Sequence, residues 1–200
     1  MLNMIKGCHI HSSQQLKEEY THNEFTWTAN VNADKIGPLV QDFIAIQASP
    51  VFFILELPCR RTEEEIWREQ GIETFHKNIY YMDGLSRKKA CSLLETYGEL
   101  LIHDGMSSFG FGAHDHTAEI MSEKYNVVTL WSKDQTKYDT FFEAHGIQKA
   151  HHMVTAWNTF SQGTPGHTFL YTHNGANIFS LVDQLKPQGL YWAEQREEDD

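Results

Sequence analysis

The segment from Val51 to Leu57 constrains the fold more than any other part of this chain. It is a near-continuous run of branched and aromatic apolar residues, interrupted only by Glu56. Such a run predicts a central strand covered on both faces, because a half-exposed strand would alternate apolar and polar residues. The run falls far short of the ~20 apolar residues that span a membrane. We therefore expect a sheet buried inside a soluble domain.

Helical and strand patterns alternate along most of the chain. Apolar residues recur at steps of three and four in three segments, 36–44, 90–101 and 178–185. Strand patterns fall at 25–31, 79–82, 107–113, 127–131 and 168–172. This order predicts a single α/β or α+β domain, in which amphipathic helices flank a mixed β-sheet. We place it at residues 25–193, between a polar N-terminal segment (1–24) and an acidic, frayed tail (194–200).

Local signals mark the ends of several elements. Ser86 precedes the clearest helical stripe and is expected to cap it. Thr62 and Glu65 have the spacing of a capping box, which predicts a short helix that ends at Gly71. A further helix is expected from Asp134 to Gly146. The chain thus supplies starts and stops for its predicted helices.

Two glycines interrupt the strand predicted at 107–113. Gly110 and Gly112 alternate with Phe109 and Phe111. Glycines at alternate positions leave one strand face bare, so another backbone, a side chain or a ligand can approach closely there.

The charge balance excludes one large class of partner. Sixteen basic residues against twenty-seven acidic ones give a formal net charge of -11. A chain this acidic repels phosphate backbones, so we expect no nucleic-acid ligand. The short basic runs at Arg60–Arg61 and at 87–89 adjoin predicted helix starts and are interpreted as solvated surface. The acidity favours a basic partner, such as a cationic protein.

The cysteines indicate a reducing compartment. Cys8, Cys59 and Cys91 are odd in number and lie far from C-x-x-C spacing, so we expect reduced thiols. The first residues carry too short an apolar stretch for a secretory signal. We therefore expect a cytoplasmic location. No cysteine has neighbours typical of an activated nucleophile.

Histidine is the one outlier in composition, with twelve residues in 200. His114 and His116 would point to the same side of a strand, and Glu119 could complete a His2Glu metal site. The pattern resembles in part the metal-binding motifs of cupins, although the His-to-Glu spacing is one residue short. The other interpretation is a His- and Asp-rich surface loop after a strand.

Signatures of common enzymes are missing from the sequence. It contains no G-x-S-x-G, no Walker A motif and no G-x-G-x-x-G after a predicted strand. We therefore lean towards a protein that is not an enzyme and has no cofactor. The alternative is a metal-dependent hydrolase or oxygenase that holds one divalent metal ion through His114, His116 and Glu119.

Three runs carry a family resemblance: Tyr80–Ser86, Tyr97–Gly112 and Tyr125–Trp131. In these runs the chain resembles small bacterial cytosolic proteins, some of which serve as immunity partners of secreted polymorphic toxins. The resemblance covers residues 50–165 and carries over no toxin-contacting residue. It implies a protein that neutralises a toxin by direct binding.

The residues and the resemblance together give the leading hypothesis, a non-catalytic cytosolic immunity protein that binds a cationic toxin domain. We expect no membrane partner and assign no oligomeric state. The predicted contact residues cluster after the glycine-rich strand and are Asp104, His114, Asp115, His116 and Glu119.

Overall fold

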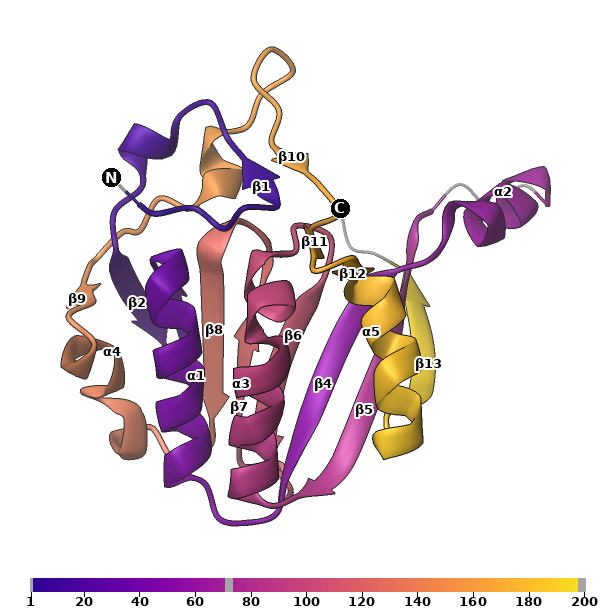
Figure 1. Cartoon of the computed structure of the whole chain (residues 1–200). Coiled ribbons are helices and arrows are strands. Elements are labelled where there is room, and N and C mark those ends of the chain that lie inside the picture. Colours follow the sequence, from indigo (N-terminus) through magenta and orange to yellow (C-terminus); the bar gives the residue numbers. More distant parts are fainter. Residues whose placement is uncertain (1, 71–73, 198–200) are drawn as a thin grey trace.

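Figure 1 shows the computed structural model of the chain, which describes residues 2–70 and 74–197. Within them, nine strands form one sheet in the order β13-β5-β4-β6-β7-β8-β3-β2-β9. The strands are β2 (Glu19–Asn23), β3 (Thr26–Asn30), β4 (Val51–Pro58), β5 (His76–Leu85), β6 (Ser108–Ala113), β7 (Ala118–Ser122), β8 (Val127–Ser132), β9 (Gln148–Lys149) and β13 (Tyr191–Glu197). Strand β9 runs parallel to β2, and the other described neighbours are antiparallel. The predicted single domain with a mixed sheet is confirmed.

Three helices cover one face of the sheet (Figure 1). They are α1 (Ala33–Ile46), α3 (Arg87–His103) and α5 (Ile178–Leu185). Their buried residues share one core with alternate residues of the strands, such as Phe53 of β4 and Phe111 of β6. Ser86 caps α3 as predicted, because its Oγ accepts a hydrogen bond from the backbone N–H of Lys89 at 3.2 Å. The apolar stripes at steps of three and four correspond to these three helices.

Strand β4 is covered on both faces, as its apolar run predicts. Phe53 and Leu55 face the helices, whereas Phe52 and Ile54 belong to a second, smaller cluster on the opposite face. The Phe52 ring lies directly over Gly112, where an added Cβ would overlap it. The bare strand face predicted from the glycines of β6 is therefore filled by side chains of neighbouring strands.

The remaining segments form what we call the cap, residues 2–16 and 156–177, at one end of the sheet (Figure 1). It contains two short ladders, β1 (Cys8–His9) with β10 (His167–Thr168) and β11 (Thr172–His173) with β12 (Ala176–Asn177). Short helices α2 (Arg61–Glu69) and α4 (Phe141–Ala144) lie outside the main helical layer (Figure 1). Five 3-10 turns complete the described residues: Ser13–Gln15, Lys124–Asn126, Thr136–Tyr138, Ala156–Thr159 and Lys186–Gln188.

Two glycines let three backbone segments cross at the base of the cap. The N–H of Phe169 donates to the carbonyl of Gly7 at 2.7 Å, and the N–H of Gly105 donates to the carbonyl of Phe169 at 3.1 Å. The N–H of Gly7 in turn donates to the carbonyl of His103 at 2.8 Å. A Cβ at either glycine would overlap the backbone of the other. The contact thus depends on the absence of side chains at both positions.

Both predicted domain boundaries are wrong. The N-terminal segment buries Leu2, Ile5, Leu16 and Tyr20 in the main core, and residues 19–23 form β2. These apolar residues are spaced without a helix or strand period, so no local pattern reveals them. Residues 194–197 continue β13 and are not frayed, and residues 198–200 lie outside the described chain.

Several local predictions also need correction. The N-cap of helix α2 is Arg60, two residues before the predicted Thr62, and Glu63 accepts the N–H of Arg60 at 2.9 Å. The predicted end at Gly71 lies outside the described residues. The predicted helix 134–146 is a 3-10 turn followed by α4, because the Asp134 side chain accepts backbone N–H groups in an Asx-type turn. The strand predicted at 168–172 is replaced by the two-residue strands β10 and β11.

In the described parts of the chain, none of the helices has the length and apolar character needed to cross a membrane.

The glycine crossing gives the first prediction. Replacement of Gly105 by alanine should lower the free energy of unfolding by about 3 kcal/mol, since the new methyl group overlaps backbone that cannot move alone. Chemical denaturation measures this change. Gly163→Ala is the matched control, because a Cβ there meets open space. Equal stability of the two variants would contradict the role of the crossing.

Candidate functional site

The sheet has a second face over which no described helix lies (Figure 1). The register shows which residues share it: Ile54, Gly110, Met121, Thr129, Thr28 and Thr21 stand opposite one another across six strands. The next row holds Phe52, Gly112, Glu119, Trp131, Thr26 and Asn23. We call this surface the open face; the residues used below are Phe52, Ile54, Glu56, Lys77, Tyr81, Glu119, Met121, Glu123, Thr129 and Trp131.

The open face has an apolar centre and a polar flank. Phe52 and Ile54 are almost fully buried, and Tyr81 and Met121 pack against them from β5 and β7. On the β8–β3–β2 side the outward residues are mostly threonines, among which Trp131 keeps 36% of its surface exposed. An apolar centre beside a half-exposed tryptophan is typical of surfaces that bind proteins.

Three carboxylates gather on this face: Glu56, Glu119 and Glu123. Burial raises the pKa of Glu119, and the neighbouring charge of Glu56 raises it further, against the opposing effects of His116 and Arg196. Burial also raises the pKa of Glu123, although a hydrogen bond from Thr129 acts in the other direction. The Nζ of Lys77 donates to Glu56 at 2.8 Å. The carboxylates of Glu119 and Glu123 have therefore lost part of their hydration. The nearby positive groups balance their negative charge only in part, which favours the approach of a cation.

A hollow of about 350 Å³ lies where the open face meets the cap. Glu56, Glu123 and Met121 line one part of it, and Trp157 lines another. Trp157 is 52% exposed, and its ring stands edge-on to Tyr125 at 5.0 Å between centroids. Lys77 and Lys124 also contribute to the lining. Carboxylates beside an exposed indole suit the long side chain of an arginine or a lysine.

Four of the five predicted contact residues lie at one end of the open face. His114, Asp115 and His116 are exposed in the turn between β6 and β7, and the ring of His116 lies 5.7 Å from that of Phe52. Glu119 follows on β7 and faces the open side.

Asp104 is the exception, and its prediction as an exposed contact is wrong. It is 1% exposed at the end of α3. Its carboxylate accepts the backbone N–H groups of Met106, Ser107 and Tyr171 at 2.9–3.0 Å. A short carboxylate after a helix satisfies such N–H groups well, so Asp104 joins the cap to α3.

The geometric basis of the predicted metal site also fails. His114 and His116 lie in a turn and not on a strand, and His116 has a left-handed backbone with φ of 54°. As the side chains of the described residues lie, no three of the types His, Cys, Asp and Glu converge on a point that could hold a metal ion.

Sequence reasoning missed Glu56, Glu123 and Trp131 as members of the surface. The sequence does not predict strand β7, so no pattern places Glu119 and Glu123 on the same sheet face as Glu56. The alternation of residues along 118–123 could have predicted this strand. Glu119, Met121 and Glu123 face one side, and the buried Ala118, Ile120 and Ser122 face the other.

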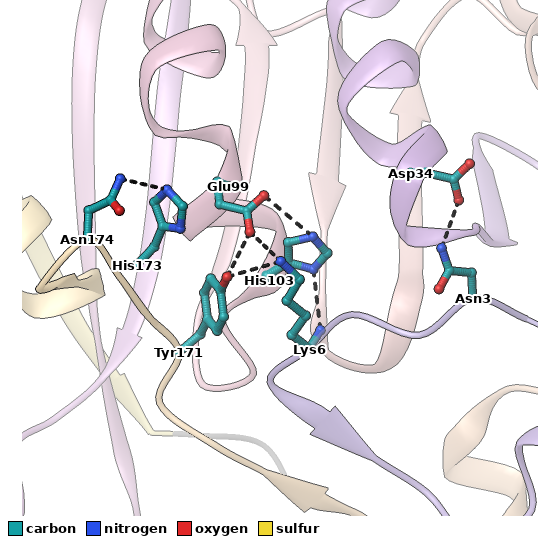
Figure 2. A network of polar contacts seen from close by, with 8 residues as sticks. All are labelled: Asn3, Lys6, Asp34, Glu99, His103, Tyr171, His173 and Asn174. Carbon is teal, nitrogen blue, oxygen red and sulfur yellow. Dashed lines mark hydrogen bonds and ion pairs between the residues drawn. The ribbon is translucent and has the colours of Figure 1, made fainter.

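A second polar cluster joins the cap to α3 (Figure 2). Glu99 accepts hydrogen bonds from Lys6 at 2.5 Å and from the hydroxyl of Tyr171 at 2.7 Å. The backbone N–H of Lys6 donates to Nδ1 of His103 at 3.3 Å, and burial lowers the pKa of His103. The two donors to Glu99 hold its pKa at about 2. Because these groups satisfy one another and come from three distant segments, we interpret the cluster as a structural clamp.

The clamp predicts a specific dependence of stability on pH. The folded-state pKa of Glu99 lies below its usual value of 4.5, so its contribution is complete above pH 4.5 and is lost as the pH falls towards 2. Solvent screening limits that contribution to about 1 kcal/mol. Wild type should exceed Glu99→Gln in unfolding free energy by this amount at pH 6, and the difference should vanish near pH 2. A constant difference across this range would contradict the clamp.

On the open face, the ionised carboxylate of Glu119 should affect the free energy of unfolding in the opposite direction to that of Glu99. Because its pKa is raised in the folded state, its charge disfavours folding above its usual pKa. Glu119→Gln should therefore raise the free energy of unfolding at pH 7 by about 0.5 kcal/mol. Thermal and urea denaturation measure the change. A loss of stability would show that the carboxylate is already well paired within the chain.

Comparison with known proteins found no matching family model, no matching curated protein and no matching solved structure.

Proposed function

We propose that this chain is a non-catalytic binding protein of the immunity type, which neutralises a cationic toxin by docking it on the open face. One observation carries the proposal: the open face combines an apolar centre with the incompletely compensated carboxylates of Glu119 and Glu123. Such a surface gains from a partner that brings both apolar contact and positive charge.

Charge supports the choice of a cationic partner. The chain carries a formal net charge of -11, so its field attracts basic proteins from a distance and repels nucleic acids. At contact, a lysine or arginine of the partner would replace the water lost around Glu119 and relieve its repulsion with Glu56. The negative charges would therefore speed the association of the cationic partner and also orient it on the open face.

The hollow supports a specific anchor. An arginine of the partner would extend its guanidinium towards Glu123 and lie against the indole of Trp157. Trp131 at the far side of the open face would form a second anchor. Large aromatic and arginine contacts of this kind dominate the energetics of many interfaces.

The cysteines are compatible with action in the cytoplasm. Among the described residues, Cys8, Cys59 and Cys91 are not joined by disulfide bonds. Cysteines without disulfides are usual in a reducing compartment. The proposal therefore places the neutralisation inside the cell that makes the protein.

The test is direct binding to the purified toxin domain encoded by the neighbouring gene. Titration calorimetry should show a 1:1 complex whose affinity falls steeply as salt rises. The double variant Glu119→Gln, Glu123→Gln should bind at least about tenfold more weakly, which corresponds to ~1.4 kcal/mol. The toxin should remain active in the presence of this variant at concentrations at which wild type inhibits it.

The matched control is the double variant Glu69→Gln, Glu95→Gln, which removes the same number of charges from exposed positions on α2 and α3. It should retain affinity within about twofold, because distant charges are screened. Absence of any complex would overturn the proposal. Equal losses of affinity in both double variants would show that the binding is non-specific charge attraction and would overturn docking on the open face.

A further inference from the structure

Three histidines that are far apart in the sequence meet in the cap. His9 on β1 stands directly opposite His167 on β10. Their ring centroids are 6.4 Å apart, and the ring of His11 lies 5.4 Å from His9 and 6.2 Å from His167. This group is separate from the open face and from the histidines at 114 and 116.

The backbone aims all three imidazoles outward. Along the segment from Cys8 to His11, residues 8 and 10 are buried and residues 9 and 11 are exposed, as expected for an extended chain. His167 is exposed as well. Cys8 points into the core on the other side of the segment, so its thiol is turned away from the three imidazoles.

The rings are not engaged elsewhere in the described structure. Their ring contacts are with one another and, for His167, with Phe169 at 6.3 Å. Among the described residues, no hydrogen bond or ion pair fixes any of the three imidazoles. Exposed side chains without such partners change rotamer readily.

We propose that His9, His11 and His167 form a binding site for a late first-row divalent metal ion, for which Zn²⁺ is the natural probe. Three neutral imidazoles and one water give the four-coordinate set that Zn²⁺ accepts. Nitrogen ligands of this kind bind Zn²⁺, Cu²⁺ and Ni²⁺ and do not retain Mg²⁺ or Ca²⁺.

The geometry needs only a small adjustment. Metal–nitrogen bonds of about 2.1 Å place the centroids of two ligating rings roughly 5 Å apart. The rings now stand 5.4–6.4 Å apart, so they do not converge as they lie. Rotation about the side-chain torsions of three exposed residues closes this difference without movement of the paired backbone of β1 and β10.

A metal ion bound by these histidines would cross-link the two segments of the cap, one of which contains β1 and the other β10. Strands β1 and β10 are two residues long and contribute few hydrogen bonds of their own. An ion held from both strands binds the folded chain and not the unfolded one, so it stabilises the fold by mass action. This inference does not depend on the proposed function.

The test is calorimetric titration of the full chain, without an affinity tag, with ZnCl₂ at pH 7.5. We expect saturable binding of one ion per chain and a rise in melting temperature with Zn²⁺ concentration. Co²⁺ should give the visible absorption bands of a tetrahedral site, and Mg²⁺ should give no binding. Absence of saturable 1:1 Zn²⁺ binding would overturn the inference.

Variants locate the site. His11→Ala and His167→Ala should each weaken Zn²⁺ binding at least about tenfold while circular dichroism stays unchanged, since each removes a ligand from an exposed position. His173→Ala is the control, because this cap histidine lies outside the group and has Asn174 as its hydrogen-bond neighbour. Binding that survives His167→Ala, or that is lost instead in the double variant His114→Ala, His116→Ala, would refute the assignment.

Discussion

The burial of one sheet face under α1, α3 and α5 is the constraint on which the rest of the structure depends. Phe53, Leu55, Phe109 and Phe111 face these helices and form the main core. Because strand side chains alternate, their neighbours must point to the opposite face. A small apolar cluster around Phe52 covers the middle of that face, and charged and polar side chains surround it. The one-sided core thus creates both the stability of the fold and the surface proposed to bind a partner.

The cap adds a second set of constraints at one end of the sheet. The backbone crossing at Gly7 and Gly105, the hydrogen bond that Asp104 accepts from Tyr171 and the Glu99 cluster all join it to the end of α3. These contacts bring Trp157 beside Glu123 in the hollow, and they bring His167 beside His9. Both proposals therefore rest on contacts of the cap with segments that are distant in the sequence. Each has its own test, since the hollow and the histidine group share no residue.

Local patterns predicted the parts of the fold that are long and periodic. The apolar run of β4 and the stripes of α1, α3 and α5 identify these elements because each repeats a clear period. The sequence patterns do not predict strands β2, β7 and β13, since these strands are short or polar. Strands β2 and β7 pair with a sequence neighbour across a short turn, and β13 pairs with the distant β5. The same limit applies to the site. Glu119 stands out in the sequence beside two histidines. Only the pairing of β7 with β6, and of β6 with β4, brings it near Glu56. Asp104 shows the converse. Its place in an Asp-Gly turn predicts an exposed side chain, but its carboxylate is buried and accepts three backbone N–H groups.

The central claim is that the open face, and not the helical face, receives the partner. Solution NMR of the complex with the toxin domain tests it most directly, through the indole N–H of Trp131 and the methyl group of Met121. If the partner docks on the open face, both signals should shift at saturation, while the methyl signals of Leu181, which is buried in α5, should stay in place. Shifts confined to the helical side, with Trp131 and Met121 unchanged, would contradict it.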